Sequence, residues 1–292
     1  MPDQRVAVCG DWHGNVGWAR MIARTLPYLA PDVTTLLHLG DWWMPSNAVD
    51  EIFADTSIER IYVTLGNHEP WSDITPLLDA HPGTAVRVSD ISWLLPRPAR
   101  LNIGGRSVLS LGGAASVDRA SREEGLTWWS DEAITGAHVA AAIAGGPADL
   151  MLTHESPAGT PVRPVREVLR TNPQRFPATA LEASRASRAR VSEAWDATHP
   201  ELLVHGHMHT PGGGKTADGR RVASLGRDGQ EGNLGILDMQ TLRMATPSLA
   251  ILRGMAEQHA LDVVDRERRM NSVAEALHSG TLDGLKPTPD AI

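Results

Sequence analysis

The sequence predicts an α/β fold built on a largely parallel sheet, and three observations support this. The chain has 292 residues, of which 41% are hydrophobic, so it can bury a sizeable core. Short apolar runs typical of buried strands alternate with segments that have helical apolar spacing, a pattern that favours parallel strands joined by right-handed crossovers. Several of these strands end in glycine followed by Asp, Asn or His, at the position where open α/β sheets carry their chemistry.

The first part of the chain alternates between strands and helices. A strand over 6–9 precedes a helix over 16–29, in which apolar residues recur at helical spacing. A second strand over 35–39 leads into a helix near 47–54. A third strand covers 61–65 and ends at a glycine. These units indicate parallel strands whose carboxyl ends meet at one edge of a sheet.

The pattern changes to short strands between residues 84 and 111. A hairpin is predicted over 101–109, turning at Gly104-Gly105. The next helix is expected over 131–144, with Ser130 as its N-cap. A buried strand over 150–153 follows it and ends at a histidine.

Two irregular excursions interrupt the regular elements. The segment near 114–130 is polar and carries paired tryptophans, and the segment 157–177 contains five prolines. We expect both to lie over the site, because long structureless loops within a compact domain are usually functional. A helix over 181–198 and a strand over 202–205 come next. A hairpin around Gly219 and the closing strands then complete the domain.

Residues 1–247 are therefore predicted to form one domain, and residues 248–292 a helical tail. The tail has helical apolar spacing over 249–277 and is rich in charge. We favour a helix that packs on the domain. A homo-oligomer contact through this helix is the alternative.

Polar side chains that suit metal ions follow five of the predicted strands. Carboxylate, amide and imidazole ligands together suit divalent first-row metals such as Mn, Fe, Zn or Ni, and the absence of thiolates argues against a structural zinc site. Seven candidates are too many for one ion that keeps a position open, so we expect two ions bridged by a shared carboxylate. The candidates are Asp11, His13, Asp41, Asn67, His154, His207 and His209.

Charge and composition exclude several classes of function. The formal net charge of -8 disfavours long duplex nucleic acid and anionic membranes as partners. No stretch approaches the about 20 apolar residues that span a bilayer, and no signal-peptide pattern is present, which favours the cytoplasm. The single cysteine, Cys9, lies in the first strand and cannot form an internal disulfide.

The ordered motifs, from Asp11-x-His13 through Gly40-Asp41, Gly66-Asn67-His68-Glu69 and His154 to Gly206-His207-x-His209, resemble the calcineurin-like metallophosphoesterase superfamily. This resemblance covers residues 6–237 and implies a four-layer αββα sandwich of two mixed β-sheets flanked by helices. It also implies a dinuclear metal centre. By position it assigns Asp11, His13 and His209 to the first metal, Asn67, His154 and His207 to the second, Asp41 to the bridge and His68 to the non-ligand histidine.

The predicted activity is that of a dinuclear metal-dependent phosphohydrolase. It would cleave phosphomonoester or phosphodiester bonds of a small phosphorylated substrate, such as a nucleotide. A hydroxide held between two divalent cations would attack phosphorus, with manganese as the first choice of metal. His68 would protonate the leaving alkoxide as general acid, because imidazole titrates near neutrality.

Two departures from the family pattern bear on the substrate. The Gly-Asp-x-x-Asp-Arg-Gly motif of the phosphoprotein phosphatases is replaced after Asp41 by Trp42-Trp43, which argues against a protein phosphatase. The superfamily pattern assigns no role to the 114–130 segment. We expect Arg119 or Arg122 to bind a substrate phosphate while a tryptophan stacks on a base or sugar; the alternative is two surface arginines.

Two other functions stay open. The first is a nuclease that acts on short single strands, which the negative charge permits. The second is a catalytically silent scaffold that binds metals and proteins, although neither the metal ligands nor the non-ligand histidine is missing.

Overall fold

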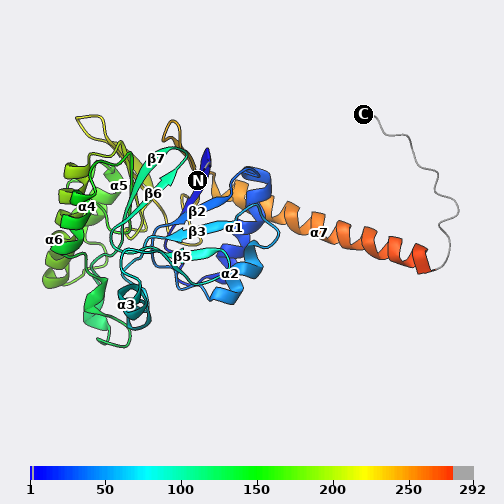
Figure 1. Ribbon diagram of the computed structural model, residues 1–292, viewed down its shortest axis with the longest axis horizontal. Coiled ribbons are helices and arrows are strands. Elements are labelled where there is room, and N and C mark those ends of the chain that lie inside the picture. Colours follow the sequence, from blue (N-terminus) through cyan, green and yellow to red (C-terminus); the bar gives the residue numbers. More distant parts are fainter. Residues whose placement is uncertain (2, 279–292) are drawn as a thin grey trace.

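The computed structural model describes residue 1 and residues 3–278, with side chains in the last helix up to residue 271. Two sheets pack face to face, and helices cover the outer face of each (Figure 1). Three buried apolar clusters fill the spaces between the four layers. The predicted α/β class and the four-layer αββα sandwich of two mixed sheets are thus confirmed.

The first sheet has seven strands in the order β13-β12-β1-β2-β3-β5-β4. Strands β1, β2, β3 and β5 are parallel to their neighbours in this series, whereas β12, β13 and β4 pair antiparallel. The strands are β1 (Arg5–Cys9), β2 (Thr35–His38), β3 (Arg60–Val63), β4 (Val86–Arg87), β5 (Ser92–Leu94), β12 (Gly235–Asp238) and β13 (Met244–Ala245).

The second sheet has six strands in the order β10-β11-β9-β8-β7-β6. Its four central strands are parallel, and an antiparallel strand closes each edge. Strands β6 and β7 form the predicted hairpin at Gly104-Gly105. The strands are β6 (Ala99–Ile103), β7 (Arg106–Leu111), β8 (Leu150–Thr153), β9 (Leu202–His205), β10 (Gly212–Lys215) and β11 (Arg221–Ser224).

The helices form the two outer layers. Helices α1 (Val16–Leu29), α2 (Ser46–Phe53) and the start of α7 (Leu249–His278) contribute to the apolar cluster on the seven-stranded sheet. Helices α4 (Gly136–Ala144), α5 (Arg163–Thr171) and α6 (Ala178–Thr198) contribute to the cluster on the six-stranded sheet. None of the helices in the described residues is both long and apolar enough to cross a bilayer.

The helix predicted over 131–144 is shorter than expected. Residues Ser130–Glu132 form one 3-10 turn, and α4 begins only at Gly136, after a capping box made by Thr135 and His138. The reason is that Glu132 is turned inward, where its carboxylate accepts hydrogen bonds from the Ser116 backbone N–H and hydroxyl at 2.6 Å. A continuous helix would not allow this buried contact.

Two helices were not predicted from the sequence. Helix α3 (Trp71–Ala80) follows Pro70 and contains Pro76, so its helical pattern is weak although it buries Trp71 and Ile74. Helix α5 lies inside the proline-rich segment 157–177, which was expected to be irregular throughout. Its proline stands in the first turn, where the missing N–H has no intrahelical partner to lose.

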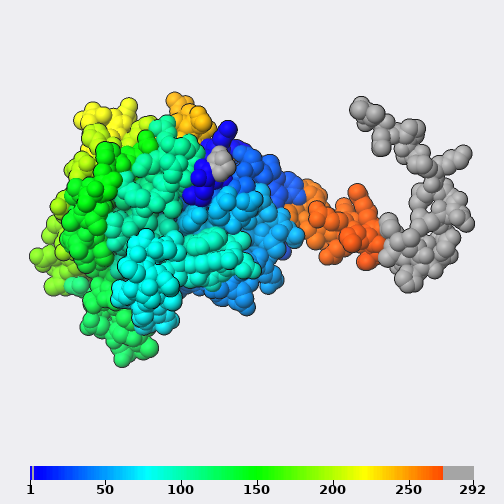
Figure 2. Space-filling model, viewed as in Figure 1, coloured from blue at the N-terminus to red at the C-terminus, as the bar shows by residue number. Residues whose placement is uncertain are grey.

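Helix α7 packs on the domain with its first turns and then extends beyond it (Figures 1 and 2). The Thr25 hydroxyl donates to the Leu252 carbonyl at 3.3 Å, and α1 and α7 are in extensive contact. Farther along the helix, Leu261, Val264 and Met270 are exposed by 61%, 42% and 66%. A homo-oligomer contact there stays a prediction, and residues 279–292 of the predicted tail lie outside the described residues.

Asn233, just before β12, is fully buried and uses its whole side-chain amide. Its Oδ1 accepts from the indole N–H groups of Trp12 at 3.0 Å and Trp18 at 2.6 Å. Its Nδ2 donates to the carbonyls of Gly10 at 2.6 Å and Gly226 at 2.7 Å. One side chain therefore joins the loop after β1, helix α1 and the segment that enters β12.

We expect Asn233→Ala to lower the free energy of unfolding by about 3 kcal/mol or more, because two indole N–H groups and two carbonyls lose buried partners. Urea denaturation measures this difference. Asn102→Ala, an exposed asparagine on β6, is the matched control and should change stability little. Equal stability of the two variants would contradict the assignment.

Candidate metal centre

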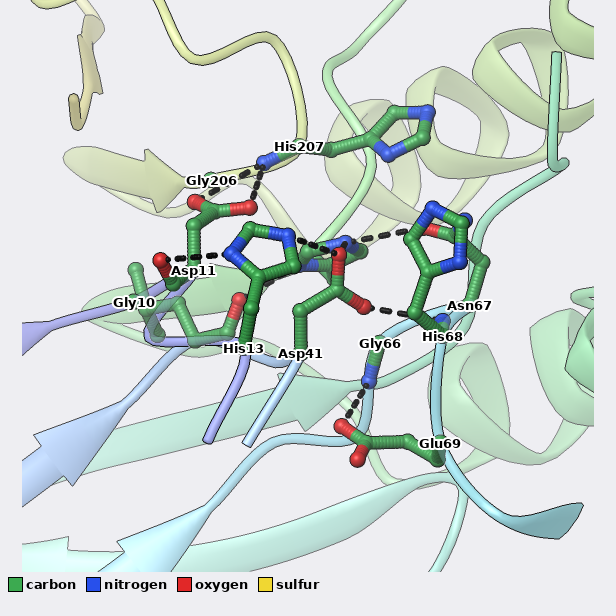
Figure 3. A network of polar contacts seen from close by, with 12 residues as sticks. Gly10, Asp11, His13, Asp41, Gly66, Asn67, His68, Glu69, Gly206 and His207 are labelled. Atoms are coloured by element: carbon green, nitrogen blue, oxygen red, sulfur yellow. Dashed lines mark hydrogen bonds and ion pairs between the residues drawn. The ribbon is translucent and has the colours of Figure 1, made fainter. Parts of the chain in front are cut away.

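The predicted ligands come from both sheets and meet at the carboxyl ends of the parallel strands (Figure 3). The loops after β1, β2 and β3 supply those from the seven-stranded sheet, and the loops after β8 and β9 supply those from the other. In Figure 3, Asp41 lies between His13 and His68. The contributors, in chain order, are Asp11, His13, Asp41, Asn67, His154, His207 and His209.

The backbone at these loops adopts an uncommon conformation. Five of the seven residues have left-handed φ values between 47° and 63°. For a residue other than glycine, this conformation is unfavourable by about 1 kcal/mol. It therefore occurs only where the surrounding structure fixes the backbone. The five are Asp11, His13, Asp41, His207 and His209.

Glycines flank the ligands because the strands approach too closely for a side chain. A Cβ on Gly66 would meet the Asp41 carboxylate, and one on Gly206 would meet that of Asp11. A Cβ on Gly40 would lie 2.5 Å from Nδ1 of His154. This explains in physical terms why glycine precedes Asp41, Asn67 and His207 in the sequence.

The first group of ligand atoms is compact. Candidate ligand atoms of Asp11, His13, Asp41 and His209 all lie within 4.8 Å of one another. Nε2 of His13 lies 3.4 Å from Oδ2 of Asp41, and Nε2 of His209 lies 3.3 Å from Oδ1 of Asp11. Both carboxylates are buried, with exposed fractions of 0% for Asp11 and 1% for Asp41. Two buried carboxylates need compensating positive charge.

A second group shares Asp41 with the first. Nε2 of His154 lies 3.3 Å from Oδ2 of Asp41 and 3.0 Å from Oδ1 of Asn67. The ring of His207 lies 5.0 Å from that of His154, and its Nε2 is buried without a hydrogen-bond partner. Oδ2 of Asp41 also lacks a hydrogen-bond partner, and it faces histidines of both groups.

Neighbouring groups orient the ligand atoms. Nδ1 of His154 lies 2.6 Å from the Leu39 carbonyl, which leaves Nε2 toward the site. Nδ1 of His13 lies 2.9 Å from the Asp11 carbonyl in the same way. The Asn67 amide donates to the Ser116 hydroxyl at 2.9 Å, so its Oδ1 faces inward.

Electrostatics in the centre favour positive charge beside Asp41. Burial alone would lower the pKa of His154, but the carboxylates of Asp41 and Asp11 raise it to about 10. Burial would raise the pKa of Asp41, yet His154 and His13 hold it well below its usual range. Burial keeps the pKa of His207 well below its usual value, so this imidazole is neutral, the form that binds metals.

The donor set therefore fits a pair of divalent cations. Oxygen and imidazole nitrogen atoms surround the Asp41 carboxylate, and two of the buried ligand atoms, Oδ2 of Asp41 and Nε2 of His207, have no hydrogen-bond partner. Mixed oxygen and nitrogen ligands are typical of divalent first-row metals. The seven predicted residues lie together, and Asp41 is the carboxylate that their two groups share.

His68 lies beside the centre without being part of either ligand group. Its backbone N–H donates to Oδ1 of Asp41 at 2.9 Å, and its Nδ1 is buried without a partner. Its Nε2 lies 3.3 Å from Nη2 of Arg122 and 3.9 Å from Oδ2 of Asp118. The pKa of His68 lies below its usual value. Burial is the main cause, the Asp41 carboxylate opposes the shift, and the positive charge of Arg122 adds to it.

The two predicted arginines have different surroundings. Arg122 donates from Nε to Asp118 at 2.8 Å and from Nη1 to the Thr127 carbonyl at 2.9 Å, so most of its fork is already engaged. Arg119 lies over Trp128, with 5.9 Å from its Cζ to the ring centroid. Arg122 is thus next to His68, whereas Arg119 is next to a tryptophan.

Four acidic residues near the ligands were not singled out as ligand partners or positioning groups from the sequence. Glu155 is fully buried, with Oε1 4.0 Å from Nε2 of His207, and its position directly after His154 is a signal that could have identified it. Asp228 lies 3.6 Å from Nδ1 of His13 but is distant in sequence. Asp118 and Glu132 likewise reach the site through the fold alone.

Comparison with known proteins agrees with this geometry. The profile of the calcineurin-like phosphoesterase family matches residues 4–211. Among solved structures, a dimetal phosphatase from Danio rerio has 12% identity and a TM-score of 0.53, covering 85% of this chain and 96% of its own. The protein TT1561 of Thermus thermophilus has 13% identity and a TM-score of 0.50, covering 84% and 98%.

These structural neighbours have low sequence identity and support the fold alone. No curated protein matches the sequence. The family profile spans more than half of the chain, and all seven predicted ligands lie within the residues that it matches. The chain therefore belongs to the calcineurin-like phosphoesterase family.

Proposed function

We propose that the protein is a dinuclear metal-dependent phosphohydrolase that cleaves phosphomonoester or phosphodiester bonds of a small substrate. The observation that carries this proposal is the position of Asp41 Oδ2, which has no hydrogen-bond partner and lies 3.4 Å from Nε2 of His13 and 3.3 Å from Nε2 of His154. A carboxylate in this position can be shared by two cations, as two-metal phosphoesterases require. The description of the Danio rerio neighbour as a dimetal phosphatase is consistent with it.

The residues would divide between two ions. Asp11, His13 and His209 would hold one, with Asp41 between them and the second set, Asn67, His154 and His207. When bound, two divalent cations supply Lewis acidity toward the phosphoryl oxygens and activation of the attacking water. Manganese is the first candidate, and Fe, Zn and Ni suit the same donor atoms.

His68 would act as the general acid. Hydrolysis forms one bond from water oxygen to phosphorus and breaks the bond to the leaving oxygen, which then takes a proton from His68. An incoming phosphate places negative charge next to the imidazole, and this raises its pKa toward the protonated form that an acid needs. Arg122 and Asp118 would hold the ring in place through their contacts at Nε2.

The two alternative functions are less well supported. A silent scaffold has no need for seven ligand residues and a non-ligand histidine at the strand ends, with five of the ligands in left-handed backbone conformations. A nuclease for short single strands would use the same metal centre. Hydrolysis of a small diester and of a short oligonucleotide by the same preparation would compare the two enzymatic proposals directly.

We expect removal of metals with a chelator to reduce hydrolysis of bis-p-nitrophenyl phosphate and p-nitrophenyl phosphate at least about 100-fold, with recovery on adding manganese. Asp41→Asn should not recover, because the amide cannot neutralise two cations. Asp73→Asn, on the exposed side of α3, should recover like the wild type. Full activity after complete metal removal would overturn the proposal.

We expect His68→Gln to keep its metals but to lose about 10² to 10⁴ in kcat for esters of alkyl alcohols. The loss should be smaller for p-nitrophenyl esters, because p-nitrophenolate leaves without a proton. Metal analysis and kinetics with both ester types provide the test, with the exposed His81→Ala as control. Equal losses for both leaving groups would exclude the general-acid role.

We expect Arg122→Ala to lower kcat about tenfold with little change in KM, because Arg122 positions His68. If Arg122 instead bound the substrate phosphate, KM would rise while kcat was kept. Arg122→Lys should not restore the rate, since a single ammonium cannot make the same forked contacts. Arg170→Ala, which removes an exposed ion pair with Glu167, is the control. Unchanged kinetics for Arg122→Ala would refute both roles of Arg122.

A further inference from the structure

A second cavity lies beside the metal centre and shares His68 with it. The first cavity has a volume of about 260 Å³ and is lined by metal-ligand candidates such as Asp41, Asn67 and His207 and by side chains of α5 and α6. The second has a volume of about 540 Å³ and contains none of the seven ligand candidates, but His68 and Arg122 form part of its wall. The imidazole of His68 is therefore a boundary between the two spaces.

The wall of this second cavity, termed the tryptophan cavity here, is aromatic and aliphatic. Its main apolar members are Trp43, Met44, Leu77, Leu126 and Trp129. They come from the loop after β2, from α3 and from the segment before α4. Helix α3 and the segment before α4 lie side by side at the lower edge of the molecule in Figures 1 and 2. The Thr75 hydroxyl of α3 donates to the Asp131 carboxylate of that segment at 2.8 Å.

Exposed large apolar side chains gather in two places, at helix α7 and at this cavity. Eight large hydrophobic residues are exposed within the described part of the chain. Four belong to α7, and Tyr28 contacts α7 through Asp262. The remaining three, Trp43, Leu77 and Leu126, all line the tryptophan cavity, with exposed fractions of 42%, 41% and 64%. An exposed apolar patch beside a candidate active site is typical of a ligand-binding surface.

Trp43 connects the cavity to the metal centre. Its ring meets that of His68 edge-on, with 5.9 Å between centroids, and that of His13 at 6.0 Å. His68 is part of the wall of both cavities, so a substrate held at the metal centre can extend past this side chain into the tryptophan cavity. Of the two cavities that border His68, the tryptophan cavity is the one without metal-ligand candidates and with tryptophan side chains in its wall.

We infer that the leaving alcohol of the substrate carries an aromatic ring and binds in the tryptophan cavity. This inference rests on the proposed function. A flat ring can stack on Trp43 or Trp129 and on the planar guanidinium of Arg122, which an aliphatic chain cannot do as well. The cavity volume lies within the about 300 to 1,000 Å³ of small-molecule sites, which is sufficient for one or two fused rings.

The test compares 2-naphthylmethylphosphonate with ethylphosphonate, two ligands that are not hydrolysed. Their binding to the full-length, manganese-loaded protein is measured by isothermal titration calorimetry. Both ligands have the same phosphonate head group, so its contribution from the metal centre cancels in the ratio of their dissociation constants. We expect the naphthyl ligand to bind at least tenfold more tightly, because the ring leaves water for the cavity.

Two variants and a matched control test whether the preference for the naphthyl ligand arises in the tryptophan cavity. Leu126→Ala and Leu77→Ala, on separate elements of the wall, should each reduce the ratio at least threefold. Leu261→Ala removes a leucine that is similarly exposed but lies on α7, and it should leave the ratio unchanged. A ratio near one in the wild type, or the same ratio in all four proteins, would overturn the inference.

The binding test and the proposed function can fail separately. If the naphthyl preference depends on Leu126 and Leu77 but metal-loaded protein hydrolyses no ester, the cavity assignment stands and the catalytic proposal fails. If esters are hydrolysed with metal dependence but both phosphonates bind equally, the catalytic proposal stands and the aromatic leaving group is excluded.

Discussion

The buried carboxylate of Asp41 is the interaction on which the rest of the site depends. An anion with 1% exposure is unfavourable unless positive charge is close to it, and the fold provides histidines on both sides of it. The His68 backbone N–H donates to one oxygen, and the other has no hydrogen-bond partner and lies within ion-pair distance of His13 and His154. The attraction between this carboxylate and the imidazole of His154 also lowers the pKa of Asp41 and raises that of His154. The two sheets thus meet around a position that requires positive charge.

Close approach of the loops is the structural condition for this arrangement. Gly66 and Gly206 leave no room for a Cβ next to Asp41 and Asp11, and five candidate ligands accept a left-handed backbone. These features are unfavourable for local folding and are fixed by the surrounding sheets. Strain of this kind concentrates where function, rather than stability, determines the conformation.

Much of the fold and most of the candidate centre could be predicted from the sequence, because short apolar strands ending in Gly-Asp or Gly-His are local patterns. The pairing order of the strands, the late start of α4 and the existence of α3 could not. Glu132 turns inward because its carboxylate binds Ser116, which is distant in sequence. Pro76 weakens the helical sequence pattern of α3. Likewise, the contact between Arg122 and His68 joins positions 54 residues apart and has no local signal.

The place of β12 in its sheet has a consequence for how the protein is made. This strand lies between β13 and β1, and Asn233 just before it binds Gly10 and Trp12 beside the first predicted ligands. Asp11 is synthesised early, but the loop after β1 that carries it lacks this support until residues up to 238, the end of β12, have been added. The metal centre therefore reaches its native geometry only late in synthesis, because His207, His209 and Asn233 all follow β9 in the chain.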